Sequence, residues 1–224
     1  MKKLCVGIAL LMLAVGSLPS RADIIGGVVT GGTAFTAGGT FVKLTVPLAN
    51  PFGPPNSVGN DNFQSPNLYG FDEDQNILLT APLTVNVGTS PIPAGTVVAS
   101  HYIFFDPGPT QEVIGTVNFD SAVLGILTST TSLAASDFLA HTGVNYLSPD
   151  ERGLEAGDSV TISGTDQILF DTVASSPGDY VRVLTAFSPG GAEAVAAPEP
   201  GSVALVGSGL VALAGMLRRK LTPH

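Results

Sequence analysis

The sequence predicts an all-β fold, a single β-sandwich or jelly-roll-like domain, and three observations lead to this prediction. Short segments rich in β-branched and aromatic residues recur along the chain, with turn-forming residues between them. Glycine and proline together make up 35 of the 176 residues from 23 to 198, which is below the ~25–30% typical of low-complexity chains but enough for many turns. A chain of this length buries ~70% of its unfolded surface as one domain.

The beginning of the chain has the pattern of a secretory signal peptide. Lys2 and Lys3 precede an apolar run over residues 4–18. Ser20 and Ala22 then supply small residues at the two positions that a signal peptidase reads. We therefore expect residues 1–22 to be removed by cleavage after Ala22.

Strand candidates follow at regular intervals in the body, residues 23–187. Three Gly-Gly pairs divide residues 23–39 into short β-prone pieces, and residues 40–48 alternate well enough to form a strand. Further strands are predicted at residues 77–80, 83–88, 96–105, 112–119, 122–128, 158–163, 167–173 and 180–187. This series of short strands, without a repeated helical period, favours the sandwich or jelly roll.

Three segments depart from the strand pattern. Residues 49–76 are predicted to form a long polar loop, and loops of this length are usually functional or disordered. Residues 131–141 suit a short helix or a packed turn, with Ser132 as the N-cap and Gly143 as the C-cap residue. The small residues at 188–197 are predicted to be a linker that keeps the following segment clear of the domain.

The end of the chain carries a three-part pattern. It opens with Pro-Glu-Pro, an extended and accessible segment, because proline and the residue before it are both steered away from helix. The apolar run at residues 201–217 follows. As a helix with a rise of ~1.5 Å per residue it would span ~25 Å, close to the lower limit for crossing a bilayer. Three cations then stop translocation on the cytoplasmic side. The residues that flank the apolar run in this pattern are Pro198, Glu199, Pro200, Arg218, Arg219 and Lys220.

This order of parts resembles the PEP-CTERM sorting signal of exported bacterial proteins, which are substrates of exosortase enzymes, and it covers residues 198–220. The resemblance implies a protein that occupies the inner membrane transiently and then reaches the cell envelope, the cell surface or the extracellular space. Its implied partners are a signal peptidase, an exosortase-type processing enzyme and, before processing, the membrane itself. An ordinary tail anchor is the alternative, although such an anchor needs no Pro-Glu-Pro at its outer edge.

Four stretches of the body are more specified than strands and turns require: residues 100–107, 119–126, 152–158 and 176–183. Together they are similar to a body domain of a subset of PEP-CTERM proteins, over residues 96–187. This similarity implies a β-rich exported module and assigns no catalytic residue.

Charge and cysteine content exclude several classes of function. Residues 23–198 keep three of the nine Lys and Arg but seventeen of the eighteen Asp and Glu, so their net charge is three minus seventeen, or −14. A body this acidic is repelled by nucleic acid and by anionic lipid, so we expect neither as a partner. The single cysteine, Cys5, leaves with the signal peptide, which removes disulfides and cysteine chemistry from the body.

The polar residues of the specified stretches are the candidate ligand or structural cluster. His101 shares a strand face with apolar residues, which favours a hydrogen-bonded core histidine over a ligand. Arg182 is one of three cations in the acidic body, so we expect it to pair with Glu155 or Asp158. The candidate cluster comprises His101, Asp106, Asp120, Glu155, Asp158, Asp179 and Arg182.

Metal chemistry has weaker support in the sequence. The histidines at 101 and 141 are too far apart for a typical zinc pattern. Calcium is the remaining candidate cofactor, with Asp61, Asp72 and Asp74 as its proposed ligands, although the EF-hand spacing is missing. Solvated loop acids are the competing interpretation, and we expect no other cofactor.

The predicted function is non-enzymatic. The resemblance implies a structural or binding component of the cell envelope or of an exopolysaccharide and biofilm matrix. The alternative is a secreted hydrolase that acts on such a polysaccharide, but the chain has no Gly-x-Ser-x-Gly motif, and two carboxylates in an acidic protein discriminate nothing. The chain has no Trp and four Tyr, which disfavours extensive sugar stacking.

Overall fold

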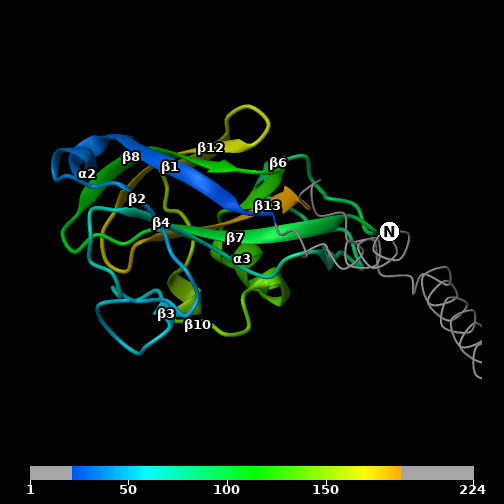
Figure 1. Cartoon of the computed structure of the whole chain (residues 1–224), viewed down its shortest axis with the longest axis horizontal. Helices are drawn as coiled ribbons and strands as arrows, with labels where there is room; N and C mark the ends of the chain where they lie inside the picture. Colours follow the sequence, from blue (N-terminus) through cyan, green and yellow to red (C-terminus); the bar gives the residue numbers. More distant parts are fainter. Residues whose placement is uncertain (1–21, 188–224) are drawn as a thin grey trace, which may run out of the picture. The chain divides into compact units, whose positions relative to one another are not determined.

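The computed structural model describes residues 22–187, which form a mostly β structure with a few short helices (Figure 1). The prediction of an all-β fold is confirmed for this part of the chain. Apart from Ala22, the predicted signal peptide lies outside the described residues, as do the predicted linker and the sorting signal. Between residues 22 and 187, no helix is both long and apolar enough to cross a membrane.

A four-stranded antiparallel sheet forms the first layer, in the order β1-β8-β12-β11. Its strands alternate between residues that face the second sheet and residues that face solvent, as the burial of β8 shows. Their bounds are Ile24–Gly31 for β1, Gln111–Phe119 for β8, Ser159–Ile162 for β11 and Gln167–Ala174 for β12.

A seven-stranded sheet forms the second layer, in the order β2-β4-β7-β13-β9-β6, with β5 beside β7. β2 and β4 run parallel, and the other pairs are antiparallel. The bounds are Phe41–Lys43 for β2, Leu68–Asp72 for β4, Ile77–Leu78 for β5, Val87–Gly88 for β6, Val97–Phe105 for β7, Val123–Leu127 for β9 and Asp179–Ala186 for β13.

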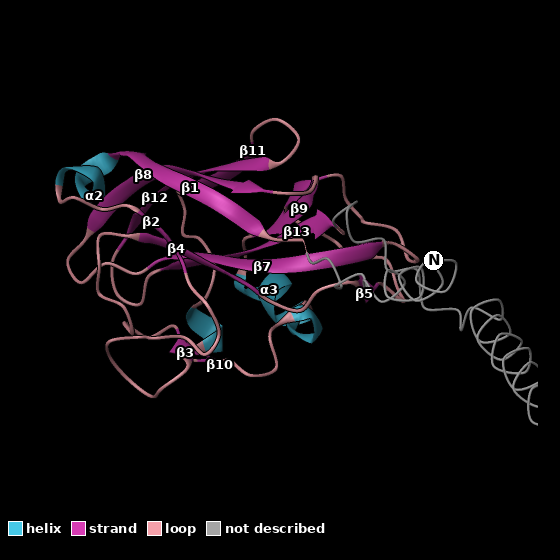
Figure 2. Ribbon diagram, viewed as in Figure 1, coloured by secondary structure: helices cyan, strands magenta, loops and turns pink. Residues whose placement is uncertain are grey.

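Helices and loops cover the other face of the seven-stranded sheet (Figure 2). This third layer contains helix α3, the 3-10 helices η1 and η2, and a small parallel pair of strands, β3 and β10. Helix α2 lies at one end of the four-stranded sheet, next to β8. The bounds are Gly32–Thr36 for α2, Ser57–Val58 for β3, Thr130–Ala135 for α3, Asp137–Leu139 for η1, Asn145–Tyr146 for β10 and Pro149–Glu151 for η2.

Two apolar cores therefore lie on the two faces of the seven-stranded sheet. Side chains alternate along its central strands, so Ile103 and Val181 pack in the core between the sheets, which we call the inter-sheet core. Phe104 and Tyr180 point the opposite way into the core beneath the helices and loops, which we call the outer core. Because both faces are covered, β7 is buried along nearly its whole length.

The structure corrects three sequence-based boundaries. The long polar loop at 49–76 contains β3 and β4, and the strand expected at 40–48 is limited to β2. The helix expected at 131–141 is divided between α3 and η1. Its N-cap is Ser129 rather than Ser132, because the Ser129 hydroxyl accepts the Ser132 amide while the Ser132 side chain accepts the Ser129 amide, a complete capping box. Gly143 lies beyond both helices.

Candidate functional site

The most extensive polar network of the described chain is centred on Arg182, in the middle of β13. Its neighbours Val181 and Val183 face the inter-sheet core, so strand alternation directs Arg182 into the outer core. The guanidinium is fully buried, with a side-chain exposure of 0%. A buried charge of this kind costs several kcal/mol unless it is paired and hydrogen-bonded.

Glu73 supplies the pairing charge. Arg182 Nε donates to Glu73 Oε2 at 2.7 Å and Arg182 Nη2 donates to Glu73 Oε1 at 3.0 Å, a bidentate ion pair in which both side chains have 0% exposure. Burial alone would lower the pKa of Arg182, but the charge and hydrogen bonds of Glu73 outweigh it and raise that pKa. The expected pairing of Arg182 with a carboxylate is confirmed, whereas the expected partners, Glu155 and Asp158, were wrong.

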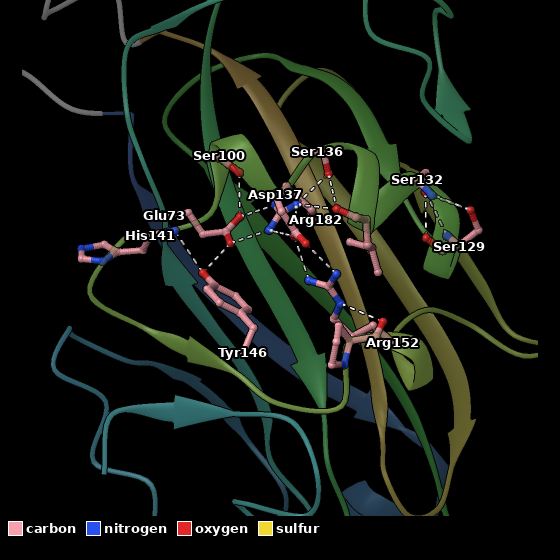
Figure 3. Close-up of polar contacts among 12 residues, drawn as sticks. Glu73, Ser100, Ser129, Ser132, Ser136, Asp137, His141, Tyr146, Arg152 and Arg182 are labelled. Carbon is pink, nitrogen blue, oxygen red and sulfur yellow. Dashed lines mark hydrogen bonds and ion pairs between the residues drawn. The ribbon is translucent and has the colours of Figure 1, made fainter. Parts of the chain in front are cut away.

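Neutral groups complete the bonding of this pair, as Figure 3 shows. The hydroxyls of Ser100 and Tyr146 each donate to a Glu73 carboxylate oxygen at 2.6 Å. Arg182 Nη1 donates to Ser136 Oγ at 2.6 Å and to the carbonyl of Leu133 at 3.1 Å. The network thus joins β10 and the segment between α3 and η1 to β7 and β13 of the seven-stranded sheet.

A second arginine extends the network towards the surface. Arg152 Nη1 and Nη2 donate to the two oxygens of Asp137 at 2.8 and 2.9 Å, and Arg182 Nη1 lies 3.4 Å from Asp137 Oδ1. Burial would raise the pKa of Asp137, but the two guanidinium groups lower it. Asp137 is therefore held as a carboxylate, with 45% of its side chain exposed.

A pocket of about 420 Å³ opens over this end of the network. Its lining includes Asp137, Arg152, Tyr146 and His141. Burial, with the neighbouring Glu73, raises the pKa of Tyr146 well above its usual value, so the phenol stays protonated at ordinary pH. Glu73 is paired with Arg182, and Asp137 is paired with both Arg152 and Arg182. Because these charges are paired and Tyr146 is a fixed hydrogen-bond donor, the arrangement favours a structural role over proton transfer.

A larger pocket of about 610 Å³ lies between the segment at residues 80–86 and helix α3. Its lining is uncharged and combines apolar groups with side-chain hydroxyls and an amide: Thr80, Ala81, Pro82, Leu83, Thr84, Asn86, Ser129, Thr131, Ser132, Ala135 and Phe138. Asn86 Oδ1 accepts the Ser132 hydroxyl at 2.5 Å and the Thr128 amide at 2.8 Å, which fixes this residue against the capping box. The Phe138 side chain is 57% exposed.

His101 lies on the inter-sheet side of β7 and is fully buried. Its Nδ1 lies 2.7 Å from Asp72 Oδ1 and its Nε2 lies 3.1 Å from Thr185 Oγ1, which confirms the expectation of a hydrogen-bonded core histidine. Lys43 Nζ is 2.7 Å from the other oxygen of Asp72. Burial would raise the pKa of Asp72, but its bonds with His101, Lys43 and Ile24 lower it to about 2.

Asp72 and Glu73 point to opposite faces because they are consecutive residues at the end of β4. One carboxylate meets His101 on the inter-sheet side and the other meets Arg182 on the outer side. Asp72, one of the proposed calcium ligands, is therefore bonded to His101 and Lys43 and is not grouped with Asp61. Asp74, another proposed ligand, follows Glu73 in the chain. Over residues 22–187 the structure gathers no cluster of three or more His, Cys, Asp or Glu that could hold a metal ion.

Three other predicted acids form a separate group. Asp179 is buried between the sheets, and burial, with the charges of Asp158 and Glu155, raises its pKa to about 7. The Thr172 hydroxyl lies near enough to lower this pKa, although neither Thr172 Oγ1 nor Asp179 Oδ2 reaches a hydrogen-bond partner among the described residues. Asp158 accepts the backbone amides of Glu155 and Val173.

Asp106 and Asp120 lie apart from that group. Asp120 Oδ1 accepts the backbone amide of Asp23 at 2.9 Å, beside the predicted cleavage site. Asp106 is fully buried, and its Oδ2 accepts the amide of Phe63 at 3.0 Å. The Asp106 carboxylate therefore bonds to a segment 43 residues away in sequence. The predicted cluster is thus divided among several locations.

Sequence reasoning missed the residues that complete the Arg182 network, namely Glu73 as its partner, Ser100, Ser136, Asp137, Tyr146 and Arg152. Asp72 and Glu73 are consecutive acids at the end of a short apolar segment. If this segment had been recognised as a strand, its alternation would have placed the two acids on opposite faces of the sheet. Tyr146 lies in the two-residue strand β10 and Asp137 in the short helix η1, and their contacts with Glu73 and Arg182 are made across large sequence separations.

Comparisons with protein-family models, with curated proteins and with solved structures give no match for this chain. The PEP-CTERM resemblance therefore rests on the residues quoted for it.

Proposed function

We propose that this protein is an exported component of the cell envelope or the extracellular matrix, with a β-sandwich body that is delivered to the surface by exosortase-type processing of its C-terminal segment. Its role there is structural or binding, directed at an extracellular polysaccharide. A signal peptidase removes residues 1–22, and the sorting segment holds the protein at the inner membrane before processing.

The observation that carries the proposal is the order of parts at residues 198–220. Pro-Glu-Pro, an apolar run long enough for a short span and a cluster of three cations occur together and in that order. The first part gives access to a processing enzyme, the second enters the bilayer and the third arrests translocation. The charge contrast supports the same order, because the cations are concentrated in the terminal segments while residues 23–198 carry −14.

The described body supports a binding or structural role through two features. The ion pair of Arg182 and Glu73 is directed at its own protein neighbours and holds the third layer on the seven-stranded sheet. The pocket between residues 80–86 and α3 has an uncharged, hydroxyl-bearing lining, which includes the exposed residue Phe138. Neutral sugars offer hydroxyls for such groups and an apolar ring face for an aromatic side chain.

The test follows the termini of the protein in a bacterium that expresses an exosortase. We expect mass spectrometry of surface material to show an N-terminus at Asp23 and a C-terminus near Pro-Glu-Pro. A variant with Pro198→Ala and Pro200→Ala should remain in the membrane fraction with its basic tail. The matched control is Pro189→Ala, a proline change in the predicted linker that should be processed normally.

Two outcomes would overturn the proposal. An intact Arg218-Arg219-Lys220 tail on mature surface material would remove the processing step. Equal processing of the Pro198 and Pro200 variant and of the control would remove the role of the tripeptide.

A further inference from the structure

We infer that Asp61 and Asp106 form a binding site for a hard divalent cation of the calcium class, located where the segment at residues 61–65 meets the end of β7 and the start of β13. The site lies apart from the Arg182 network and goes beyond the proposed function. It is built from two carboxylates that are far apart in sequence and that each retain one unused, buried oxygen.

Asp106 provides the first observation. The residue is 0% exposed, and its Oδ2 accepts the Phe63 amide at 3.0 Å. Its Oδ1 is buried as well and meets no donor in hydrogen-bond geometry in residues 22–187, although the backbone amide of Asn62 lies near enough to lower the pKa of Asp106. Leaving a buried carboxylate oxygen without a partner costs free energy, so this atom requires a proton, a water or a cation.

Asp61 provides the second observation. Its Oδ2 accepts the Ser176 hydroxyl at 2.5 Å, whereas its Oδ1 is buried and, within the described chain, also lacks a partner. The two acids belong to one place in the fold, because Phe63, two residues after Asp61, donates its backbone amide to Asp106 Oδ2. Burial first and then the charge of Asp61 raise the pKa of Asp106, to about 6. The two neighbouring carboxylates therefore present two oxygens that lack hydrogen-bond partners in the described chain, and their negative charges repel each other.

The surroundings hold both carboxylates in place. Phe63 packs its ring in an aromatic group of the outer core. Its ring centroid lies 4.7 Å from that of Tyr69 and 4.9 Å from that of Phe104. Ser65 also donates its backbone amide to the carbonyl of Asp106 at 2.9 Å. The segment that carries Asp61 is thus anchored on both sides of Phe63, which preorganises the site.

Neutral oxygens are available beside the acids. The Tyr180 hydroxyl lies near enough to lower the pKa of Asp106, but it donates its hydrogen to the carbonyl of Pro177. It therefore leaves the carboxylate unsatisfied and keeps oxygen lone pairs for a cation. Two carboxylates with a phenolic oxygen and water match the all-oxygen ligand set of Ca²⁺, which also accepts irregular geometry more readily than Mg²⁺ does.

The chemistry predicts selectivity as well as binding. Thiolate and imidazole ligands, which favour Zn²⁺, are missing from the group of residues named here, so the order of affinity should be calcium above magnesium, with zinc not preferred. Binding would fasten the segment at 61–65 to the turn that begins at Ser176. The site thus stabilises the folded body rather than taking part in a reaction.

The experiment titrates the full-length chain in detergent micelles at pH 8, where Asp106 is ionised. Terbium serves as the probe because it replaces calcium at oxygen sites, and the ring of Tyr180 lies beside the carboxylates as a sensitiser. We expect tyrosine-sensitised emission that calcium displaces and that magnesium at equal ionic strength does not. Calcium about a hundredfold above its dissociation constant should raise the melting temperature by about 5–10 °C relative to magnesium.

The matched variants are Asp61→Asn and Asp166→Asn. Asp61 is only partly buried and an asparagine oxygen can still accept the Ser176 hydroxyl, so this change should preserve the fold while reducing calcium affinity at least tenfold. Asp166 lies exposed in another loop, and its replacement should leave the affinity unchanged.

Equal melting temperatures of the unmodified protein in calcium and magnesium would overturn the inference, whether or not the variants fold. Equal calcium affinity of the Asp61→Asn and Asp166→Asn proteins would also overturn it, because binding would then come from the diffuse acidic surface.

Discussion

Two buried acids that lie along β7 are satisfied in different ways. Glu73, next to Ser100, receives both a guanidinium and two hydroxyl donors. Asp106, immediately after the strand, receives the amide of Phe63 on one oxygen and keeps the other oxygen buried without a partner among residues 22–187. Both carboxylates face the outer core, so the difference arises from the partners and not from the degree of burial.

The difference follows from the scarcity of cations. Lys43, Arg152 and Arg182 are the lysines and arginines of residues 23–198, and the structure pairs them with Asp72, Asp137 and Glu73 respectively. With all three cations committed, no lysine or arginine side chain of the described residues is left to pair with Asp106 or Asp179. A protein this acidic therefore stabilises some buried carboxylates internally and leaves others to a proton or to an external cation.

The largest effect is expected at the complete pair. Arg182→Met should destabilise the protein by about 3–5 kcal/mol, because it leaves the Glu73 carboxylate buried without its counter-ion. Urea denaturation of both proteins measures this difference. Arg152→Met is the control, since its partner Asp137 is 45% exposed and can be solvated when left alone. Equal losses in the two variants would mean that the Glu73 pair has no special weight.

A smaller effect of opposite sign is expected at Asp179, whose pKa is raised to about 7 by burial and neighbouring acids. Between pH 4 and 7 the folded state binds the proton that the unfolded state has released, so stability falls as pH rises. Asp179→Asn removes this cost and should add about 1–2 kcal/mol at pH 8 while flattening the profile above pH 5. If the Asp179→Asn protein has the same stability as the unmodified protein at pH 8, the Asp179 carboxylate is solvated and the prediction is wrong.

The smallest effect is expected at Lys43, which is 34% exposed beside Asp72. Lys43→Met should cost about 0.5–1 kcal/mol near neutral pH, because partly exposed pairs are weakened by solvent screening. The folded pKa of Asp72 is lowered to about 2, so its contribution is present above pH 4 and is lost as pH falls towards 2. Thermal melts across this range should show the lysine variant losing less stability on acidification than the unmodified protein.

Period-two patterns predicted β7, β8, β12 and β13 closely, because each has an apolar face that must be buried. The equally long β1 was divided into short pieces instead, because Gly-Gly pairs interrupt its pattern. β4 was missed because its short apolar run, Leu68–Asp72, lies between polar segments that resemble a loop. The pairing of Glu73 with Arg182 spans 109 residues, and no local pattern specifies such a partner. The same limit applies to Asp61 and Asp106, which tertiary packing of Phe63 brings together.

The contrast between the complete and the incomplete acid is tested most directly by comparing Glu73→Gln with Asp106→Asn in urea denaturation at pH 8 with a calcium chelator present. We expect Glu73→Gln to destabilise the protein, since Arg182 loses its counter-charge, and Asp106→Asn to stabilise it, since an uncompensated charge is removed and the Phe63 amide keeps an acceptor. A loss of stability in Asp106→Asn as large as that in Glu73→Gln would contradict the account, because both acids would then be equally satisfied within the protein.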